Sequence, residues 1–178
     1  MKIFMIACVT SDMYIGYNNN LLVSLKPDMA HFKQITMGHM VVMGKNTYLS
    51  LPDKKPLPHR TNVIISTTMS EAPEGFKLFH SVNDFLNAYH DYDSTVFVIG
   101  GAKIYDAFMP FVEKVYLTHV HRTVRDLYFG DEIDYTKLTK FPDSVYEIKW
   151  NLQISADEIC LDKRFGIVHY NFLTLLRR

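Results

Sequence analysis

The chain has 178 residues, which is enough for a single domain with a sizeable hydrophobic core. Lys plus Arg and Asp plus Glu are equal at 19 each, and this neutral balance gives no support for a nucleic-acid or membrane-surface partner. The two cysteines, Cys8 and Cys160, form no metal-binding spacing, and no apolar stretch reaches membrane-spanning length, so we expect a cytoplasmic protein without a metal site.

The order of apolar and polar residues predicts one mixed α/β domain over residues 1–178. About eight strands are predicted, over residues 3–9, 40–43, 62–66, 77–80, 96–99, 114–120, 145–154 and 167–176. About four helices are predicted to begin at Pro27, Lys45, Val82 and Ala102, and loops or turns are predicted over 12–20, 52–60, 122–139 and 157–164. Strands and helices alternate at first, and the last two strands resemble a hairpin. We therefore expect a mostly parallel eight-stranded sheet with an antiparallel C-terminal edge and helices on both faces.

Two of the predicted strands run directly into glycine. The strand Val96–Ile99 is followed by Gly100–Gly101 and a helix, and the strand Met40–Met43 is followed by Gly44 and a helix. Glycine lets the backbone approach a ligand closely, and a helix N-terminus favours phosphate, so each turn is a candidate anion site. The alternative is a tight connection with no ligand. Ser66–Thr67 follow a third strand, and ligands in such sheets bind outside the carboxyl ends of strands.

Asp28 is the one carboxylate on an apolar helix face. It shares this face with Phe32 and Ile35, at i+4 and i+7. A buried carboxylate is costly unless another group pairs with it, which indicates a functional role. The alternative is that Asp28 only complements the helix dipole in the first turn.

Several motifs together resemble the dihydrofolate reductase family. They occur in the order and nearly the spacing of that family and span most of the chain. The matching pieces are Ile6–Ala7, Ile15–Gly16, Asp28 with Phe32–Lys33, Val42–Tyr48, Pro56–Arg60, Val98–Tyr105, Val115–His119 and Asp126.

The resemblance implies NADPH-dependent reduction of 7,8-dihydrofolate to 5,6,7,8-tetrahydrofolate, with a proton delivered to N5. Asp28 would accept two hydrogen bonds from the pterin and support protonation through water, and Thr118 would join the same network. Arg60 would bind the glutamate α-carboxylate, for which a guanidinium fork is well shaped. The other substrate-binding residues that the resemblance implies are Ile6, Ala7, Met29, Phe32, Leu51 and Ile99.

The resemblance also implies the residues that would bind NADPH. Lys45, Ser66 and Thr67 would contact its 2′-phosphate. The pyrophosphate would lie against Thr47 and the start of the helix after Gly100, whose peptide bond to Gly101 is expected to be cis. The loop over residues 18–23 would close over the nicotinamide. The full implied set is Ala7, Ile15, Gly16, Leu21, Gly44, Lys45, Asn46, Thr47, Ser66, Thr67, Gly100, Gly101, Ala102, Lys103, Ile104 and Tyr105.

The chain departs from the family at two positions. Leu22–Val23 stand where the family usually has Pro-Trp, and valine cannot donate the hydrogen bond of the tryptophan. Lys45 stands in place of the more usual arginine, so a cation remains but stacking on adenine is lost. We therefore expect weaker folate binding or slower protonation, by roughly tenfold, than in a typical member.

Two other functions stay open at this point. The first is a pyrimidine reductase of riboflavin synthesis with the same fold and cofactor, although Asp28, Thr118 and Arg60 match the folate pattern instead. The second is a non-catalytic homologue with a structural or regulatory role, which the Leu22–Val23 departure would fit. For the favoured function we expect a small-molecule substrate, dihydrofolate, and a monomeric enzyme.

Overall fold

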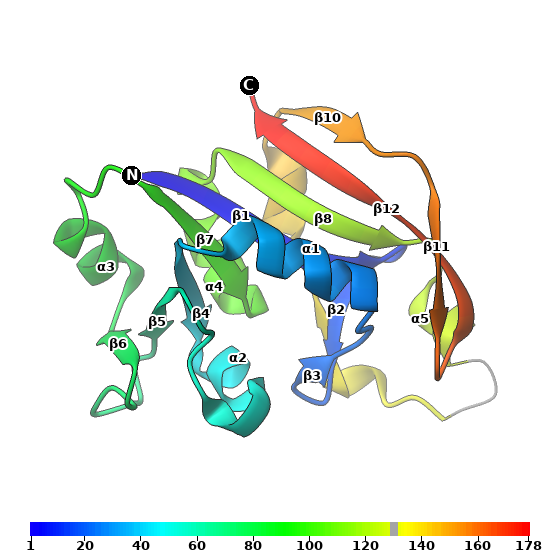
Figure 1. Ribbon diagram of the computed structural model, residues 1–178, viewed down its shortest axis with the longest axis horizontal. Helices are drawn as coiled ribbons and strands as arrows, with labels where there is room; N and C mark the ends of the chain where they lie inside the picture. The colour runs from blue at the N-terminus through cyan, green and yellow to red at the C-terminus, as the bar shows by residue number, and fades with distance from the viewer. Residues whose placement is uncertain (129–131) are drawn as a thin grey trace.

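The computed structural model describes residues 1–128 and 132–178, and its largest feature is one sheet (Figure 1). Nine strands form this sheet in the order β10-β12-β8-β1-β7-β4-β5-β6, with β11 also paired to β12. The pairings from β8 through β1, β7, β4 and β5 to β6 are parallel, whereas β12 is antiparallel to β8, β10 and β11. This confirms the predicted parallel sheet with an antiparallel C-terminal edge. The bounds are β1 Lys2–Thr10, β4 Met40–Gly44, β5 Thr61–Ile65, β6 Phe76–Phe79, β7 Thr95–Gly100, β8 Lys114–Val120, β10 Trp150–Ile154, β11 Glu158–Asp162 and β12 Gly166–Arg177.

Helices cover both faces of the sheet. In Figure 1, α1 crosses the front of the sheet and α4 lies behind it. Alternate residues of the central strands point to opposite faces. Val41, Met43 and Ile64 thus pack with α1 and α2, whereas the core on the other face includes Val42 and Val63 together with side chains of α3 and α4. The α-helices of the described residues are α1 Lys26–Thr36, α2 Lys45–Ser50, α3 Val82–Ala88, α4 Ala102–Phe108 and α5 Val124–Leu127.

Shorter 3₁₀ turns lie at Pro52–Lys54, Met109–Phe111, Tyr135–Lys137 and Asp143–Glu147. Ser81 caps α3 as predicted, because its Oγ accepts a hydrogen bond from the Asp84 N–H at 3.0 Å. Across the described residues, no helix has the length and apolar character needed to cross a membrane.

Two of the predicted loops contain regular structure. A second sheet of three strands joins β2 (Tyr14–Tyr17) to β3 (Asn20–Leu21) and to β9 (Leu138–Lys140). The loop prediction over 12–20 was therefore wrong, because only Asn18 and Asn19, both at positive φ, form the turn between β2 and β3, whereas Asn20 begins β3. The prediction for 122–139 was also wrong where α5, a 3₁₀ turn and β9 form. Residues 129–131 of that stretch lie outside the described residues.

The C-terminal edge differs from the prediction in two places. The stretch 145–154 is a strand only from Trp150 onward, because a 3₁₀ turn occupies Asp143–Glu147. The predicted turn over 157–164 instead contains β11, which forms a tight hairpin with β12 and brings the large sheet to nine strands rather than eight. β10 and β11 pair with successive parts of β12, so Glu158 and Asp162 belong to an exposed edge strand, whereas Lys163 and Arg164 lie in the turn that follows.

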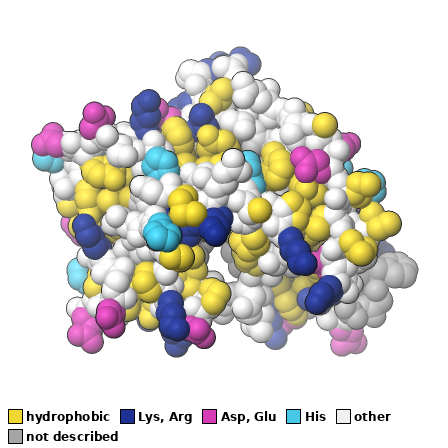
Figure 2. All heavy atoms as spheres, viewed as in Figure 1, with side chains coloured by type: hydrophobic (Ala, Val, Ile, Leu, Met, Phe, Trp, Pro, Cys, Tyr) yellow, Lys and Arg dark blue, Asp and Glu magenta, His cyan; other side chains and the backbone are white. Residues whose placement is uncertain are grey.

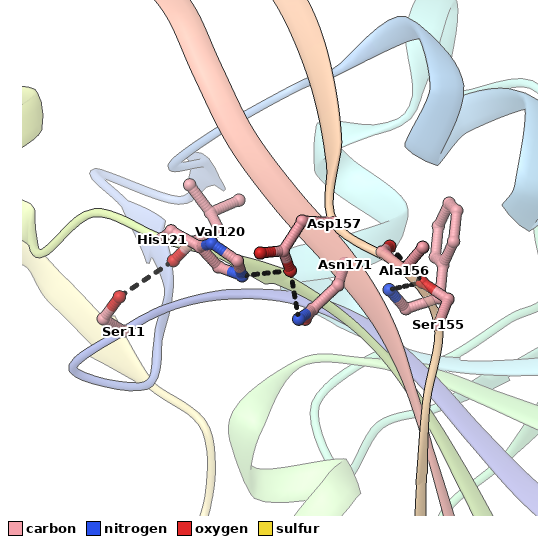
Figure 3. Close-up of polar contacts among 8 residues, drawn as sticks. Ser11, Val120, His121, Ser155, Ala156, Asp157 and Asn171 are labelled. Atoms are coloured by element: carbon pink, nitrogen blue, oxygen red, sulfur yellow. Dashed lines mark hydrogen bonds and ion pairs between the residues drawn. The ribbon is translucent and has the colours of Figure 1, made fainter.

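A β-bulge separates β10 from β11. Ile154 lies opposite Leu173 and Glu158 lies opposite Tyr170. The three residues 155–157 therefore face only the two residues 171–172 of β12. Polar contacts hold this bulge, as Figure 3 shows. The Ser155 hydroxyl accepts a hydrogen bond from the Phe172 N–H at 3.0 Å, and Asp157 Oδ1 accepts one from Asn171 Nδ2 at 3.1 Å. Asp157 Oδ1 also lies 3.8 Å from His121 Nε2.

The half-buried His119, beside this bulge, should make the stability of the protein depend on pH. Its ring centroid lies 5.3 Å from that of His121. Burial, and after it the charge of His121, lowers the pKa of His119 below its usual 6.5, although a hydrogen bond to Asn171 acts the other way. The unfolded chain therefore binds the proton more tightly, and the free energy of unfolding should fall as the pH falls below that value.

We expect His119→Gln to lose less of its free energy of unfolding than wild type between about pH 7 and pH 5. Urea denaturation at both pH values measures the difference. An equal loss in both proteins would contradict this prediction.

Candidate active site

A buried carboxyl–hydroxyl pair lies between α1 and the sheet. Asp28, in the first turn of α1, is 6% exposed, and Thr118 on β8 is 2% exposed. The Thr118 hydroxyl donates a hydrogen bond to Asp28 Oδ1 at 2.5 Å. Desolvation raises the pKa of Asp28, and the hydrogen bond from Thr118 lowers it in part. Asp28 is thus a paired, buried acid rather than an exposed residue that only complements the helix dipole.

The neighbours of Asp28 are mostly apolar or uncharged. Cys8 lies beside Thr118 in the parallel pairing of β1 with β8. Burial and then the charge of Asp28 raise the pKa of Cys8, so the thiol keeps its proton. Tyr105 on α4 donates a hydrogen bond from its hydroxyl to the Ile6 carbonyl at 2.7 Å, which ties α4 to β1. These groups leave Asp28 in a dry environment with few polar partners.

Four of the six apolar residues that were predicted to line the substrate lie together on the α1 face of the sheet, whereas Ala7 packs in the core on the other face. Ile6, Phe32, Leu51 and Ile99 belong to one hydrophobic cluster on the α1 face of the sheet. Ala7 is buried on β1, and Met29 is 38% exposed on α1. Figure 2 shows the surface hollowed below α1, between the part of the molecule with α2 and the part with β2 and β3. The hollow therefore lies below α1, the helix that carries the buried Asp28 and contributes Phe32 to the apolar cluster.

Arg60 lies at the edge of the same cluster. Its guanidinium carbon is 5.5 Å from the centroid of the Phe32 ring. Its Nε is buried without a hydrogen-bond partner, and burial lowers the pKa of the side chain. A buried guanidinium N–H without a partner is costly, so this donor is suited to an acidic group of a ligand.

The two glycine turns meet at the carboxyl ends of neighbouring parallel strands. Met43 on β4 is in register with Gly100 on β7, and the Gly100–Gly101 peptide bond is cis, as expected. A Cβ atom at Gly44 would lie 2.9 Å from Ile104 Cγ1, and one at Gly101 would lie 3.5 Å from Thr47 Oγ1. A side chain at Gly44 would therefore crowd Ile104, whereas one at Gly101 would make only an ordinary van der Waals contact. Because neither residue has a side chain, the backbone of the two turns can contact an extended ligand closely.

Hydroxyl and basic groups continue from these turns toward β5. Lys45 Nζ donates a hydrogen bond to Thr68 Oγ1 at 3.2 Å, and the Thr68 N–H donates to Ser66 Oγ at 3.2 Å. Ser66 is buried and Thr67 is exposed, directly after β5. His80 Nδ1 lies 3.0 Å from the Ser66 carbonyl oxygen. Thr68 and His80 were not among the candidate residues predicted from the sequence. The run of hydroxyl side chains Ser66–Thr68 could have pointed to Thr68.

Other predicted cofactor residues lie on α4, β2 and β3, and one of them, Tyr105, is buried with its hydroxyl already bonded to the Ile6 carbonyl. Ala102 is half-buried and Lys103 exposed on α4, and Ile15 and Gly16 lie on β2. Leu21 is 56% exposed on β3. The turn between β2 and β3 reaches α2, because Asn46 Nδ2 donates a hydrogen bond to Asn19 Oδ1 at 3.4 Å.

Leu22 and Val23, the atypical pair, are buried. They pack in a second cluster with Leu25, Val120, Val124, Leu127, Tyr128, Val168 and Tyr170. Val23 therefore fills an apolar position and offers no hydrogen bond to a ligand. Within residues 1–128 and 132–178, no three His, Cys, Asp or Glu side chains are grouped so that they could hold a metal ion.

Comparisons with known proteins agree with this arrangement. A family model described as dihydrofolate reductase matches residues 2–155. A dihydrofolate reductase from Buchnera aphidicola is 36% identical over 132 residues, or 74% of this chain and 80% of that protein. One from Staphylococcus aureus is 32% identical over 164 residues, or 92% and 91%. The fold is similar to a solved dihydrofolate reductase from Enterococcus faecalis complexed with NADP(H) and RAB-propyl, with a TM-score of 0.79, 22% identity and coverage of 99% and 96%.

Thr118→Val should raise the pKa of Asp28 further, because the variant loses the hydrogen bond that favours the carboxylate. An NMR titration of the Asp28 carboxyl carbon measures this shift. Thr36→Val is a matched control, since Thr36 is equally buried and its hydroxyl bonds to the Phe32 carbonyl on the same helix. An Asp28 pKa that is unchanged or lower in Thr118→Val would contradict the prediction.

Proposed function

This chain belongs to the dihydrofolate reductase family, and from this membership we propose that its groove binds NADPH beside 7,8-dihydrofolate. The enzyme is an oxidoreductase that reduces dihydrofolate to 5,6,7,8-tetrahydrofolate with NADPH. The observation that carries the assignment of the site is the buried Asp28–Thr118 pair, which lies by the apolar cluster on the same sheet that carries the two glycine turns. One carboxylate in a dry groove is suited to a ligand with an amidine-like edge.

The alternative functions have less support. Family membership and the relatives named dihydrofolate reductase do not favour a pyrimidine reductase of riboflavin synthesis. A non-catalytic homologue would have no need of both a buried acid with a raised pKa and an unpartnered guanidinium donor.

Asp28, held in place by Thr118, would orient the substrate and support its protonation through water. The carboxyl oxygens of Asp28 would accept hydrogen bonds from the 2-amino group and N3–H of the pterin, and Thr118 would keep the carboxyl in place. Bound NADPH supplies the hydride that reduces the substrate. Because desolvation raises the pKa of Asp28, the acid keeps a proton at higher pH than an exposed aspartate does, and it can support protonation of N5 through water.

The residues of the groove fit NADPH. Gly44, Gly100 and Gly101 leave the backbone open for a pyrophosphate, with Thr47 beside them. Lys45, Ser66 and Thr67 would take the 2′-phosphate at the end of β5, and Thr68 and His80 add polar groups there. The nicotinamide would lie near Ala7 and Ile15–Gly16. The other residues that would contact the cofactor are Leu21, Asn46, Ala102, Lys103, Ile104 and Tyr105.

Arg60 would bind the glutamate α-carboxylate of the substrate. Its unpartnered Nε and the aromatic face of Phe32 support this role. The segment 18–23 would close over the nicotinamide and exclude water, which strengthens the electrostatic interactions inside. All of these groups come from one chain, so we propose that a monomer is the catalytic unit. We also propose that the enzyme works in the cytoplasm.

Loss of NADPH absorbance on addition of dihydrofolate tests the function. We expect turnover with dihydrofolate and none with the pyrimidine substrate of riboflavin synthesis. NADPH binding without turnover of either substrate would instead support a non-catalytic role.

Asp28→Asn should lower kcat by about a hundredfold or more, because an amide cannot supply the proton. The dissociation constant of NADPH should stay within about twofold, since Asp28 lies apart from the glycine turns. Steady-state kinetics and fluorescence titration with NADPH measure the two quantities. Equal losses in both would mean that Asp28 has only a structural role.

Val23→Trp should raise kcat/KM by up to about tenfold if a missing hydrogen bond limits the reaction. Because Val23 is 5% exposed, the larger ring should also cost about 1–3 kcal/mol of stability. Leu22→Trp is the control: it overpacks the same cluster from the neighbouring position. A folded Val23→Trp enzyme with no gain over wild type would show that position 23 does not limit the rate.

A further inference from the structure

We propose that Asn62 is a positioning residue that aims Arg60 at the carboxylate of the substrate tail. Asn62 lies at the start of β5 and is 3% exposed. It does not face the reacting atoms, and its amide is used entirely within the loop before β5. This inference rests on the proposed function, because it presumes that Arg60 binds an acidic tail.

The side chain of Asn62 forms hydrogen bonds with both ends of the short loop Leu57–Arg60. Its Oδ1 accepts a hydrogen bond from the Leu57 N–H at 2.9 Å, and its Nδ2 donates to the Leu57 carbonyl at 2.9 Å and the Arg60 carbonyl at 3.1 Å. Three bonds from one buried amide leave few ways for the segment Leu57–Arg60 to move. The last of them holds the backbone of Arg60 itself.

The rest of the loop shows why such an anchor is needed. His59 has a positive φ of 58°, a conformation that non-glycine residues adopt only at a cost. Two backbone hydrogen bonds join the end of the loop to residues 38–39. The Gly38 N–H donates to the His59 carbonyl at 2.9 Å, and the Thr61 N–H donates to the His39 carbonyl at 3.1 Å. Between Leu57 and His59 the described side-chain bonds come from Asn62, so its amide sets the direction in which Arg60 leaves the loop.

The position of the guanidinium matters because its Nε is buried without a partner. A two-pronged bond from Nε and a terminal nitrogen to a carboxylate requires correct distance and direction at both atoms. A displacement of the loop by about 1 Å would lose this geometry while leaving the pterin pocket intact.

The place of Asn62 on β5 provides an internal control. Ser66, proposed to bind the cofactor phosphate, follows the other end of the same strand. A substitution that disturbed β5 as a whole would weaken NADPH binding, whereas one that only released the Leu57–Arg60 loop would not.

The test compares two substrates in Asn62→Ser: dihydrofolate, and a dihydropterin that lacks the benzoyl-glutamate tail. We expect kcat/KM for dihydrofolate to fall about tenfold, mostly through KM, with the tail-less substrate and NADPH affinity within about twofold of wild type. Asn171→Ser is the matched control, since Asn171 is another buried asparagine, 8% exposed on β12, and should affect neither substrate selectively. In an Arg60→Ala background, Asn62→Ser should have no further effect on dihydrofolate.

Parallel losses for both substrates, a parallel loss of NADPH affinity, or an undiminished effect in the Arg60→Ala background would overturn the proposal, because each indicates a purely structural role. If Asn62→Ser does not fold, Asn62→Asp is measured in the same way, since it keeps the acceptor for Leu57 N–H and loses both donors. A wild-type enzyme that reduces neither substrate would overturn the proposed function as well. If the wild-type enzyme turns over normally but the Asn62 variants give one of the contradicting results, only the proposal for Asn62 fails and the proposed function stands.

Discussion

The cost of burying the Asp28 carboxyl is the constraint on which the site depends. An acid that is 6% exposed needs a partner, and the fold provides one hydroxyl, from Thr118, at 2.5 Å. That contact requires the start of α1 to lie against β8, and β8 is positioned by its long parallel pairing with β1. Desolvation outweighs the single hydrogen bond, so the pKa of Asp28 is raised and the group can hold a proton for chemistry.

The parallel sheet explains how the two ligands can meet. β4, β7 and β5 end at the same edge, so Gly44, Gly100–Gly101 and Ser66 lie along one edge of the sheet, where we propose that the extended anionic cofactor binds. The acid lies on the α1 side, three strands along the sheet from β4 toward β8. Tyr105 links the two regions through its bond to the Ile6 carbonyl. Substrate and cofactor sites are therefore fixed by the same strands.

Local patterns in the sequence were sufficient to predict the features whose structure is determined by residues close together in the chain. The strand–glycine–helix turns and the cap at Ser81 follow from residue type and spacing, and the structure agrees with them. For Asp28 the sequence left two interpretations open, and the structure shows that the carboxyl is buried. The small sheet was missed because β2 pairs with β9, more than a hundred residues away, and neither strand has a strong pattern of its own. The bulge and β11 were missed because exposed edge strands carry charges that resemble a turn. Asn62 was missed because its role depends on contacts that the sequence does not reveal.

The dependence of the hydride-transfer rate on pH tests the central claim most directly. Single-turnover oxidation of NADPH by dihydrofolate would be followed in the wild-type enzyme from acid to alkaline pH. Because Asp28 is proposed to support protonation of N5, the rate should fall as the pH rises through the raised pKa of this group. A rate that stays flat across this range would contradict the role of Asp28 as the source of the proton.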